Sequence, residues 1–256
     1  MSSKCICLGM SVLVATLLFA SSALAGGLNL AWNNCASDGG LQAKVSACLT
    51  NVGVNVLVGS FVPIDDIAGV TGIECVLDII VGDGTSPIPP WWDLGELGSS
   101  GGACRQQALR VDAVPPGTAI YCTDWSGGLA SGGFGAYIAA GPVPPVNQPA
   151  HRRLVLGFAV PLVNAADLVN TGEYLGFEVR ISNMKAVGDG SCAGCSTPAC
   201  IVLNDINIVA GTTTSQHLGA GTFAGSNFAT WQTSGPDCAI VPTRRTTWGA
   251  VKQLYH

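Results

Sequence analysis

Short apolar runs separated by glycine and proline constrain the fold of this chain more than any other feature of its sequence. Each run has the length of a β-strand, and several alternate apolar with polar residues, as half-buried strands do. In the run 174–181 the apolar residues predicted to share one strand face are Leu175, Phe177, Val179 and Ile181. The nine predicted strands are 28–32, 54–62, 73–81, 108–114, 134–140, 154–160, 174–181, 200–209 and 228–231.

This pattern predicts an all-β protein. Short strands broken by 34 glycines and 14 prolines are typical of two packed antiparallel sheets, as in a jelly roll or another Greek-key sandwich. Residues 26–256 have the length of a single domain of this kind, and no proline-rich or charged linker divides them. Helical spacing is found at four positions, Leu41, Val45, Cys48 and Leu49. The glycines at 39 and 40 and the nearby cysteine also fit a looped excursion.

One short helix is expected at the C-terminus. Thr246 or Thr247 is placed to cap it. Its apolar positions would then form one stripe, consisting of Trp248, Val251, Leu254 and Tyr255. We expect such a stripe to pack on the domain rather than to recruit a partner or act as a sorting signal.

The first 25 residues have the three-part pattern of a cleavable secretory signal peptide. Lys4 supplies the positive charge, the apolar stretch 8–20 follows, and small residues lead to a predicted cut after Ala25. The stretch is shorter than the roughly 20 residues of a membrane-spanning helix, and no cysteine follows the cut to carry a lipid anchor. The sequence therefore predicts a secreted protein, whether periplasmic, cell-surface or extracellular, without a membrane span after signal removal.

Charged residues are scarce. They make up 11% of the chain, against about 25% in typical domains, and the net charge is −5. The pairs Arg152–Arg153 and Arg244–Arg245 are too small to form a nucleic-acid-binding patch. Because 48% of residues are hydrophobic, the chain can build a core, which argues against disorder.

Removal of the signal peptide, with Cys5 and Cys7, leaves nine cysteines. In an oxidising compartment they are expected to pair, and because nine is odd, at least one stays unpaired. Cys75 is the predicted free, buried thiol, since it lies in the apolar register of the run 73–81. The other eight are predicted to form the disulfides Cys35–Cys48 and Cys104–Cys122 and two bridges among Cys192, Cys195, Cys200 and Cys238.

The spacing of Cys192, Cys195 and Cys200 also fits two kinds of chemical site. Zinc would need a fourth ligand, such as Cys238 or His217. A thioredoxin-like redox pair would need a helix beginning at the first cysteine, whereas a proline and a strand-like run follow here. Structural bridges are therefore favoured, and no metal or other cofactor is predicted.

Trp91 and Trp92 follow two prolines and precede Asp93, and Trp125 follows Asp124. Exposed tryptophan beside a carboxylate is typical of a sugar-binding surface, so Trp91, Trp92, Asp93 and Trp125 are the candidate ligand-binding residues, with a glycan or cell-surface component as the partner. The alternative is that the rings cap the open end of the sandwich, which is favoured because tryptophan buries a large apolar area.

The sequence gives little support to the hypothesis that the protein is an enzyme. Residues 98–102 match the G-x-S-x-G pattern of a nucleophile elbow, but no helical pattern follows, and His151 and His217 are the only interior histidines. No catalytic residue is assigned. The leading hypothesis is a secreted, non-enzymatic structural, surface or binding module of unknown ligand; the alternatives are a carbohydrate-binding module and a secreted hydrolase with paired acids.

Several blocks of the chain resemble a group of exported bacterial proteins that have no assigned activity. The blocks are 90–92, 102–105, 192–204 and 247–255, the last reading TWGAVKQLY. The resemblance extends over most of the chain that follows the signal peptide. It implies export and a shared β-rich domain, and it carries over no functional residue.

Overall fold

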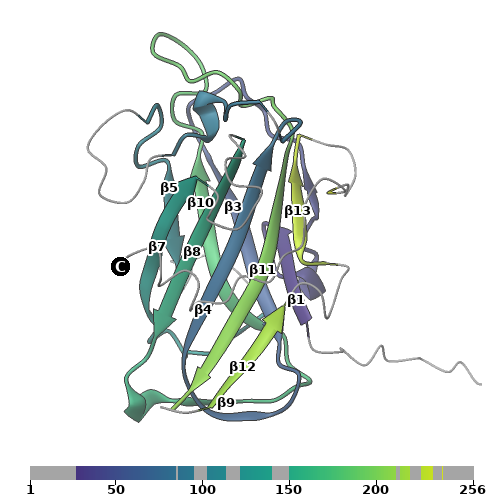
Figure 1. The fold of residues 1–256 in the computed structure, drawn as a ribbon, viewed down its shortest axis with the longest axis vertical. Coiled ribbons are helices and arrows are strands. Elements are labelled where there is room, and N and C mark those ends of the chain that lie inside the picture. The colour runs from purple at the N-terminus through teal and green to yellow at the C-terminus, as the bar shows by residue number, and fades with distance from the viewer. Residues whose placement is uncertain are drawn as a thin grey trace, which may run out of the picture.

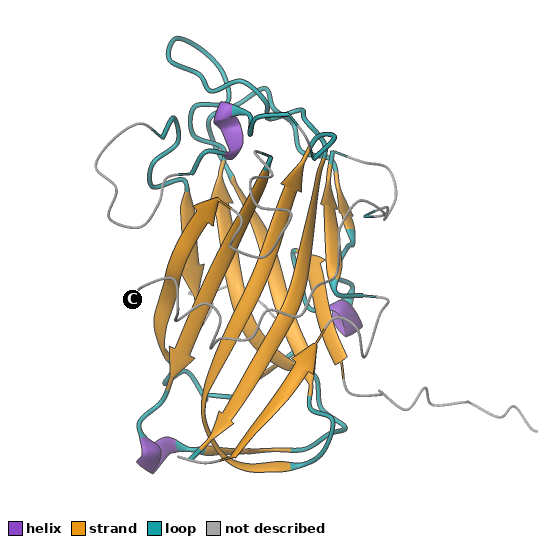
Figure 2. Cartoon of the chain, in the orientation of Figure 1, coloured by secondary structure: helices purple, strands orange, loops and turns teal. Residues whose placement is uncertain are grey.

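The computed structural model describes residues 27–84, 86–94, 103–113, 122–139, 150–211, 214–219, 226–232 and 238. This part of the chain forms 13 strands and three one-turn 3-10 helices, η1 (Ala36–Asp38), η2 (Pro90–Trp92) and η3 (Leu162–Asn164) (Figure 2). The predicted all-β class is confirmed. The expected signal peptide, residues 1–25, and the expected C-terminal helix lie outside the described residues.

Five strands form the smaller sheet, here called sheet A. Four of them pair antiparallel in the order β1 (Gly27–Trp32), β3 (Val54–Val62), β10 (Tyr174–Ser182) and β5 (Leu109–Asp112). The short strand β6 (Thr123–Asp124) adds to β10 in parallel.

Eight strands form the larger sheet, sheet B, which faces the viewer in Figure 1. Its main order is β2 (Ala43–Lys44), β13 (Phe228–Trp231), β11 (Ala199–Ala210), β4 (Ile67–Val81), β8 (His151–Ala159) and β7 (Ser131–Ala139). Two more strands pair on its margins, β12 (Thr214–Gly219) with β11 and β9 (Ala166–Leu168) with β4. All pairs are antiparallel except β2 with β13.

Two of the chain's crossings between the sheets are neighbours, the one from β3 to β4 and the one from β10 to β11. Strands β3 and β10 are neighbours in sheet A, and the strands that follow them, β4 and β11, are neighbours in sheet B. Each sheet is therefore assembled from strands distant in sequence, as in Greek-key sandwiches. The predicted two-sheet antiparallel sandwich is confirmed.

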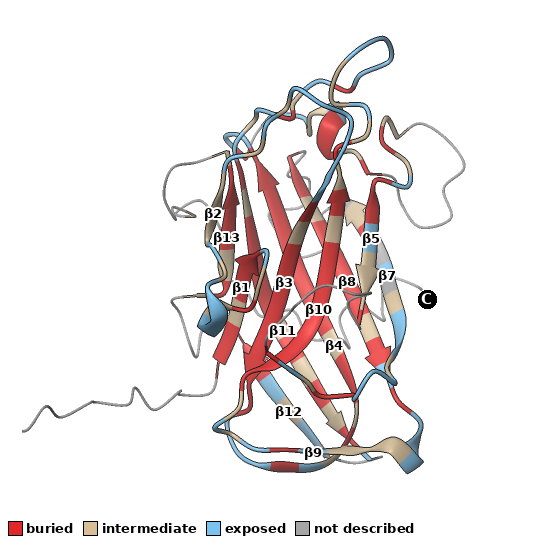
Figure 3. Cartoon of the chain, turned by 180° about the vertical axis from the view of Figure 1, so that it is seen from behind, coloured by how far each residue is buried: buried red, intermediate tan, exposed pale blue. Residues whose placement is uncertain are grey.

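One apolar core lies between the two sheets. On β4, Ile73, Cys75, Leu77, Ile79 and Val81 belong to it. Because side chains alternate along a strand, the even-numbered residues between positions 72 and 80 face away from the core. Figure 3, which views the molecule from the side of sheet A, shows that most of the strand residues are buried.

A β-bulge changes the predicted facing of one residue in β10. Phe177, Val179 and Ile181 point into the core as predicted. The register of β10 against β3 shifts between Leu175 and Phe177, and an inserted residue turns the following side chains to the other face. Leu175 therefore packs outside the sandwich in a small second cluster with Cys35, Cys122 and Val58.

The segment with helical spacing near residue 45 takes the looped alternative. Leu41, Val45 and Leu49 are exposed, and the segment contributes only the two-residue strand β2 to sheet B. A helix here would need an apolar stripe in contact with the core, and these three side chains do not provide one.

Candidate functional site

Eight cysteines are joined in four disulfides within the described residues. The pairs are Cys35–Cys122, Cys48–Cys195, Cys104–Cys192 and Cys200–Cys238. The eight paired residues are those expected from the sequence, and Cys75 is free and buried.

The predicted pairs Cys35–Cys48 and Cys104–Cys122 are wrong, because three of the four bridges join residues at least 87 positions apart. A disulfide requires the Cα atoms of its two cysteines to lie within about 7 Å of each other. The crossings of the chain between the sheets bring loops that are distant in sequence within this distance. The prediction of two bridges among Cys192, Cys195, Cys200 and Cys238 is also wrong, because only Cys200–Cys238 forms within that set. Cys192 bonds to Cys104 and Cys195 to Cys48, so neither sulfur is available to zinc or to redox exchange.

The tryptophans proposed as a sugar-binding surface are buried. Trp91 and Trp92 are fully buried in η2 at one end of the sandwich, and Trp125 is 4% exposed. The rings of Trp91 and Trp92 pack on Trp231, with centroids 6.4 and 5.7 Å away, and Trp32 contacts Trp231 at 5.7 Å. A sugar needs an open ring face, which none of the three offers. Trp91 and Trp92, packed on Trp231, form the end plug of the core, the alternative favoured from the sequence, and Trp125 belongs to the apolar core beside β6.

Arg105 holds the end plug in place through hydrogen bonds, and it was not among the candidate residues identified from the sequence. Its guanidinium is fully buried and donates to three backbone carbonyls: from Nε to Met184 O at 3.1 Å, from Nη1 to Trp91 O at 2.7 Å, and from Nη2 to Ser182 O. Burial lowers the pKa of Arg105 to about 9, so the group stays charged at neutral pH. The sequence feature that could have identified Arg105 as a structural residue was its position next to Cys104, which forms a disulfide.

Tyr137 also anchors the plug. Its hydroxyl donates to Trp92 O at 2.6 Å, and burial raises the pKa of Tyr137 above its ordinary value. Asp93, the carboxylate candidate beside the tryptophans, is partly exposed, and its carbonyl accepts from Arg105 N at 3.2 Å. The end of the sandwich therefore holds a packed aromatic and hydrogen-bonded closure.

A second polar group, here called the Asp78 cluster, lies on the outer face of sheet B. It consists of Asp78 on β4, His151 and Arg153 on β8, and Asn204 on β11. Arg153 Nε and Nη2 each donate to the Asp78 carboxylate at 2.7 Å, and Asn204 Nδ2 donates to Asp78 Oδ2 at 2.8 Å. His151 Nε2 lies 3.2 Å from Asp78 Oδ1.

The Asp78 cluster is buried and its carboxylate is ionised. Burial opposes ionisation of Asp78, but hydrogen bonds from Arg153 and His151 outweigh it and hold the pKa of Asp78 below its ordinary value. The carboxylate thus has its oxygens occupied by donors from two neighbouring strands. This geometry favours a structural ion pair over a group that acts on a substrate.

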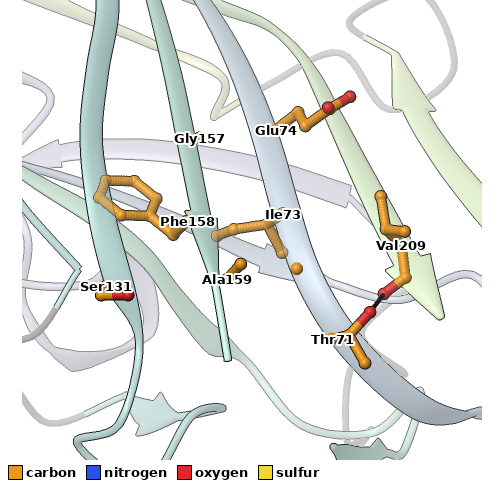
Figure 4. A pocket seen from close by; sticks show the side chains of 9 residues that line it. Thr71, Ile73, Glu74, Ser131, Gly157, Phe158, Ala159 and Val209 are labelled. Carbon is orange, nitrogen blue, oxygen red and sulfur yellow. Dashed lines mark hydrogen bonds between the residues drawn. The ribbon is translucent and has the colours of Figure 1, made fainter. Parts of the chain in front are cut away.

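A shallow groove of about 320 Å³ lies farther along the outer face of sheet B (Figure 4). The lining residues are Thr71, Gly72, Ile73, Glu74, Ser131, Gly157, Phe158, Ala159 and Val209. Glu74 is the ionisable residue of this set, and Glu74 Oε2 accepts from Asn207 Nδ2 at 3.1 Å. Gly157 pairs with Glu74 in register, and its missing side chain leaves space beside the carboxylate.

The described part of the chain does not bring together the catalytic residues that the hydrolase alternative requires. His151 belongs to the Asp78 cluster, and His217 is half exposed with Nδ1 3.7 Å from Asp205 Oδ1. The G-x-S-x-G match, residues 98–102, lies outside the described residues. Within the described ranges, no group of three His, Cys, Asp or Glu side chains is arranged to hold a metal ion.

Each helix found in the described ranges has three residues, too few to cross a bilayer. Compared with known proteins, the chain matches no family model, no curated protein and no solved structure.

Proposed function

We propose that this protein is a secreted, non-enzymatic β-sandwich module with a structural or surface role. The observation that carries the proposal is that Arg105 and Asp78, polar side chains of catalytic type, are buried and engaged in scaffold contacts. Arg105 binds three carbonyls of the end plug, and Asp78 accepts from Arg153 and Asn204. Groups held in this way have no open position for a substrate.

Glu173 supports the same proposal. It is 8% exposed, and its Oε1 accepts from Asn29 Nδ2 at 2.9 Å and from Ser60 Oγ at 2.6 Å. Its Oε2 accepts from the backbone and hydroxyl of Ser37. The carboxylate therefore ties η1 to β1 and β3.

The four disulfides support secretion. Bridges of this number persist in oxidising compartments and are rare where glutathione keeps thiols reduced. They agree with the signal-peptide pattern of residues 1–25. Export is also what the resemblance to exported bacterial proteins implies, and we propose it for this chain.

Mass spectrometry of the exported protein tests the compartment. We expect the intact mass of a chain that starts at residue 26. On reduction this mass should increase by two hydrogens for each of the four bridges. Alkylation of the unreduced, unfolded protein should modify one thiol, that of Cys75. Recovery of the chain in the cytoplasmic fraction with its leader and free thiols would contradict secretion.

Turnover assays test the non-enzymatic assignment. The pure protein is incubated with representative polysaccharides, esters and peptides, and we expect product no faster than with the reduced and unfolded protein. Hydrolysis that is lost on unfolding would overturn the assignment. In that case the Glu74 groove is the first place to test, using Glu74→Gln.

A further inference from the structure

On the outer face of sheet B, two transverse rows of residues place one carboxylate beside a floor of small side chains. Residues that pair in register across adjacent strands point to the same face of a sheet. One row consists of Gly133 on β7, Gly157 on β8, Glu74 on β4, Asn207 on β11 and His217 on β12. The neighbouring row consists of Ser131, Ala159, Gly72, Val209 and Ser215 on the same five strands. Ile73 and Ile208, which lie between the rows, point into the core, so both rows face outward.

The Glu74 groove lies over these two rows. Its volume is about 320 Å³. A Cβ atom added at Gly157 would meet no other atom within 4 Å, so the space above this glycine is open. Figure 4 shows Glu74 at one end of the groove and Thr71 and Ser131 at the other. The groove therefore has one charged end, and the rest of its lining is uncharged.

The described residues supply no positively charged partner to Glu74. Its Oε2 accepts from Asn207 Nδ2 at 3.1 Å, whereas its Oε1 has no donor within the described part of the chain. No ion pair among the described residues includes Glu74. His217, the basic residue in its row, lies with Nδ1 3.7 Å from Asp205 Oδ1 instead. A carboxylate at the end of an uncharged groove attracts a cation, because the protein wall strengthens its field.

We propose that the Glu74 groove binds an ammonium group carried on an unbranched aliphatic chain. The ammonium donates to Glu74 Oε1, and the chain lies over Gly72, Gly157 and Ala159. The two rows are two residues apart along each strand, about 6.6 Å, which a stem of the lysine type, with four carbons, spans. The ligand is therefore an aliphatic amine, either free or as the lysine side chain of another protein. This proposal does not rest on the proposed function, which is tested by turnover and by export.

The geometry favours an ammonium group over other ligand groups. A guanidinium fork pairs best with both oxygens of a carboxylate, and Oε2 of Glu74 is already held by Asn207. A sugar would stack on an aromatic ring, but the one aromatic residue of the lining, Phe158, belongs to the core between the sheets. An anion would be repelled by Glu74. An ammonium group needs one free oxygen, which Glu74 Oε1 provides.

Titration of the full disulfide-bonded protein with n-pentylamine tests the groove. Followed by heteronuclear NMR, it should give saturable shifts at the backbone amides of Gly72, Glu74, Gly157 and Ala159. The uncharged n-pentanol has the same chain and should bind at least roughly tenfold more weakly, because it lacks the charge-assisted hydrogen bond. A parallel titration with Nα-acetyl-lysine amide distinguishes the two sources of the ammonium. Shifts with both amines indicate the lysine of a partner protein, and shifts with n-pentylamine alone indicate a free amine.

Two variants separate the charge of the groove from its shape. Glu74→Gln keeps the size of the side chain and should weaken n-pentylamine binding roughly tenfold or more. Gly157→Ile fills the open space without touching another residue and should weaken binding as strongly. This variant should fold at least as stably as the unaltered protein, because β-branched residues favour strands. Asp65→Asn and Thr123→Ile, at exposed positions outside the groove, are the matched controls and should leave binding unchanged.

Three results would overturn the proposal. The first is the absence of saturable shifts at the groove when n-pentylamine is added to the folded protein. The second is equal binding of n-pentylamine and n-pentanol, which would show that the carboxylate has no part in binding. The third is binding that Glu74→Gln and Asp65→Asn weaken equally, because the amine would then be attracted only by the net negative charge of the protein, which is −5. The dispersion of the NMR spectrum shows that each variant is folded.

Discussion

The guanidinium carbon of Arg105 lies 3.2 Å from the centroid of the Trp91 ring. The same guanidinium holds three backbone carbonyls around η2. Arginine can make this set of contacts because its planar fork stacks on the ring and presents several donors at once, which an ammonium group cannot do. The buried cation thus determines how the end of the sandwich is closed.

Arg105→Lys should destabilise the protein although it keeps the charge. The ammonium cannot reach Trp91 O, Met184 O and Ser182 O together, so buried carbonyls lose their donors. We expect a loss of about 2–4 kcal/mol in the free energy of unfolding, measured by urea unfolding. Arg110→Lys on β5, at an exposed position, should change it by less than about 0.5 kcal/mol. Equal losses of stability at the two positions would show that the stacked guanidinium of Arg105 contributes no more to stability than an exposed arginine.

Gly59→Ala should disturb the contact between β3 and β10. A Cβ atom at Gly59 would lie 2.1 Å from the Cζ atom of Phe177, whose ring covers the glycine. We expect a cost of about 1–3 kcal/mol, measured by thermal and urea unfolding. The double variant with Phe177→Leu should recover part of this cost, because the smaller side chain makes room for the methyl group.

A matched glycine controls for the strand environment. Gly133 lies in β7, has an ordinary φ, and a Cβ there would meet nothing within 4 Å. Gly133→Ala should therefore leave stability unchanged or raise it slightly. A similar loss at both glycines would contradict the steric explanation.

Asp78 should make the stability of the protein depend on acid pH. Its pKa in the folded state is lowered, by hydrogen bonds from Arg153 and His151 that outweigh burial. Its contribution to stability is therefore complete above the unfolded pKa of about 3.9 and is lost as the pH falls through the lower, folded pKa. Unfolding measured from pH 7 down to pH 2 should show this loss.

Asp78→Asn should remove that part of the acid dependence and destabilise the protein at neutral pH. It leaves the buried Arg153 without its ionic partner, which costs about 3–5 kcal/mol. Asp65→Asn, at an exposed carboxylate, should leave both the acid limb and the neutral stability unchanged. If the Asp78→Asn variant lost stability between pH 7 and pH 2 in the same way as the unaltered protein, other carboxylates would control acid unfolding.

The disulfides should differ in their contributions to stability. Cys48–Cys195 joins residues 147 positions apart, whereas Cys200–Cys238 joins residues 38 apart. Loop-closure entropy predicts that loss of the longer link costs about 1 kcal/mol more. The variants to compare by thermal unfolding are Cys48→Ser with Cys195→Ser, and Cys200→Ser with Cys238→Ser. A larger loss for the shorter link would indicate that contacts of Cys238 outweigh the entropy term.

Local patterns in the sequence were enough to locate the nine predicted strands, because alternation and turn residues act within a few positions. The register of 73–81 also identified Cys75 as the buried thiol. Four further strands, β2, β6, β9 and β12, were missed. They are short or polar, and pairing with a neighbouring strand makes them extended.

Tertiary structure decided which residues meet. The Asp78 cluster joins side chains 75 and 126 positions apart, and three disulfides join loops at least 87 apart. Both follow from the crossings of the chain between the two sheets, which no local pattern records. The sequence by itself determined nine of the 13 strands, the set of paired cysteines and the all-β class, since these depend on local side-chain periodicity and on redox chemistry. The pairing of the cysteines, the outward turn of Leu175 and the burial of Trp91 depended on packing between distant segments, so only the folded molecule could decide them.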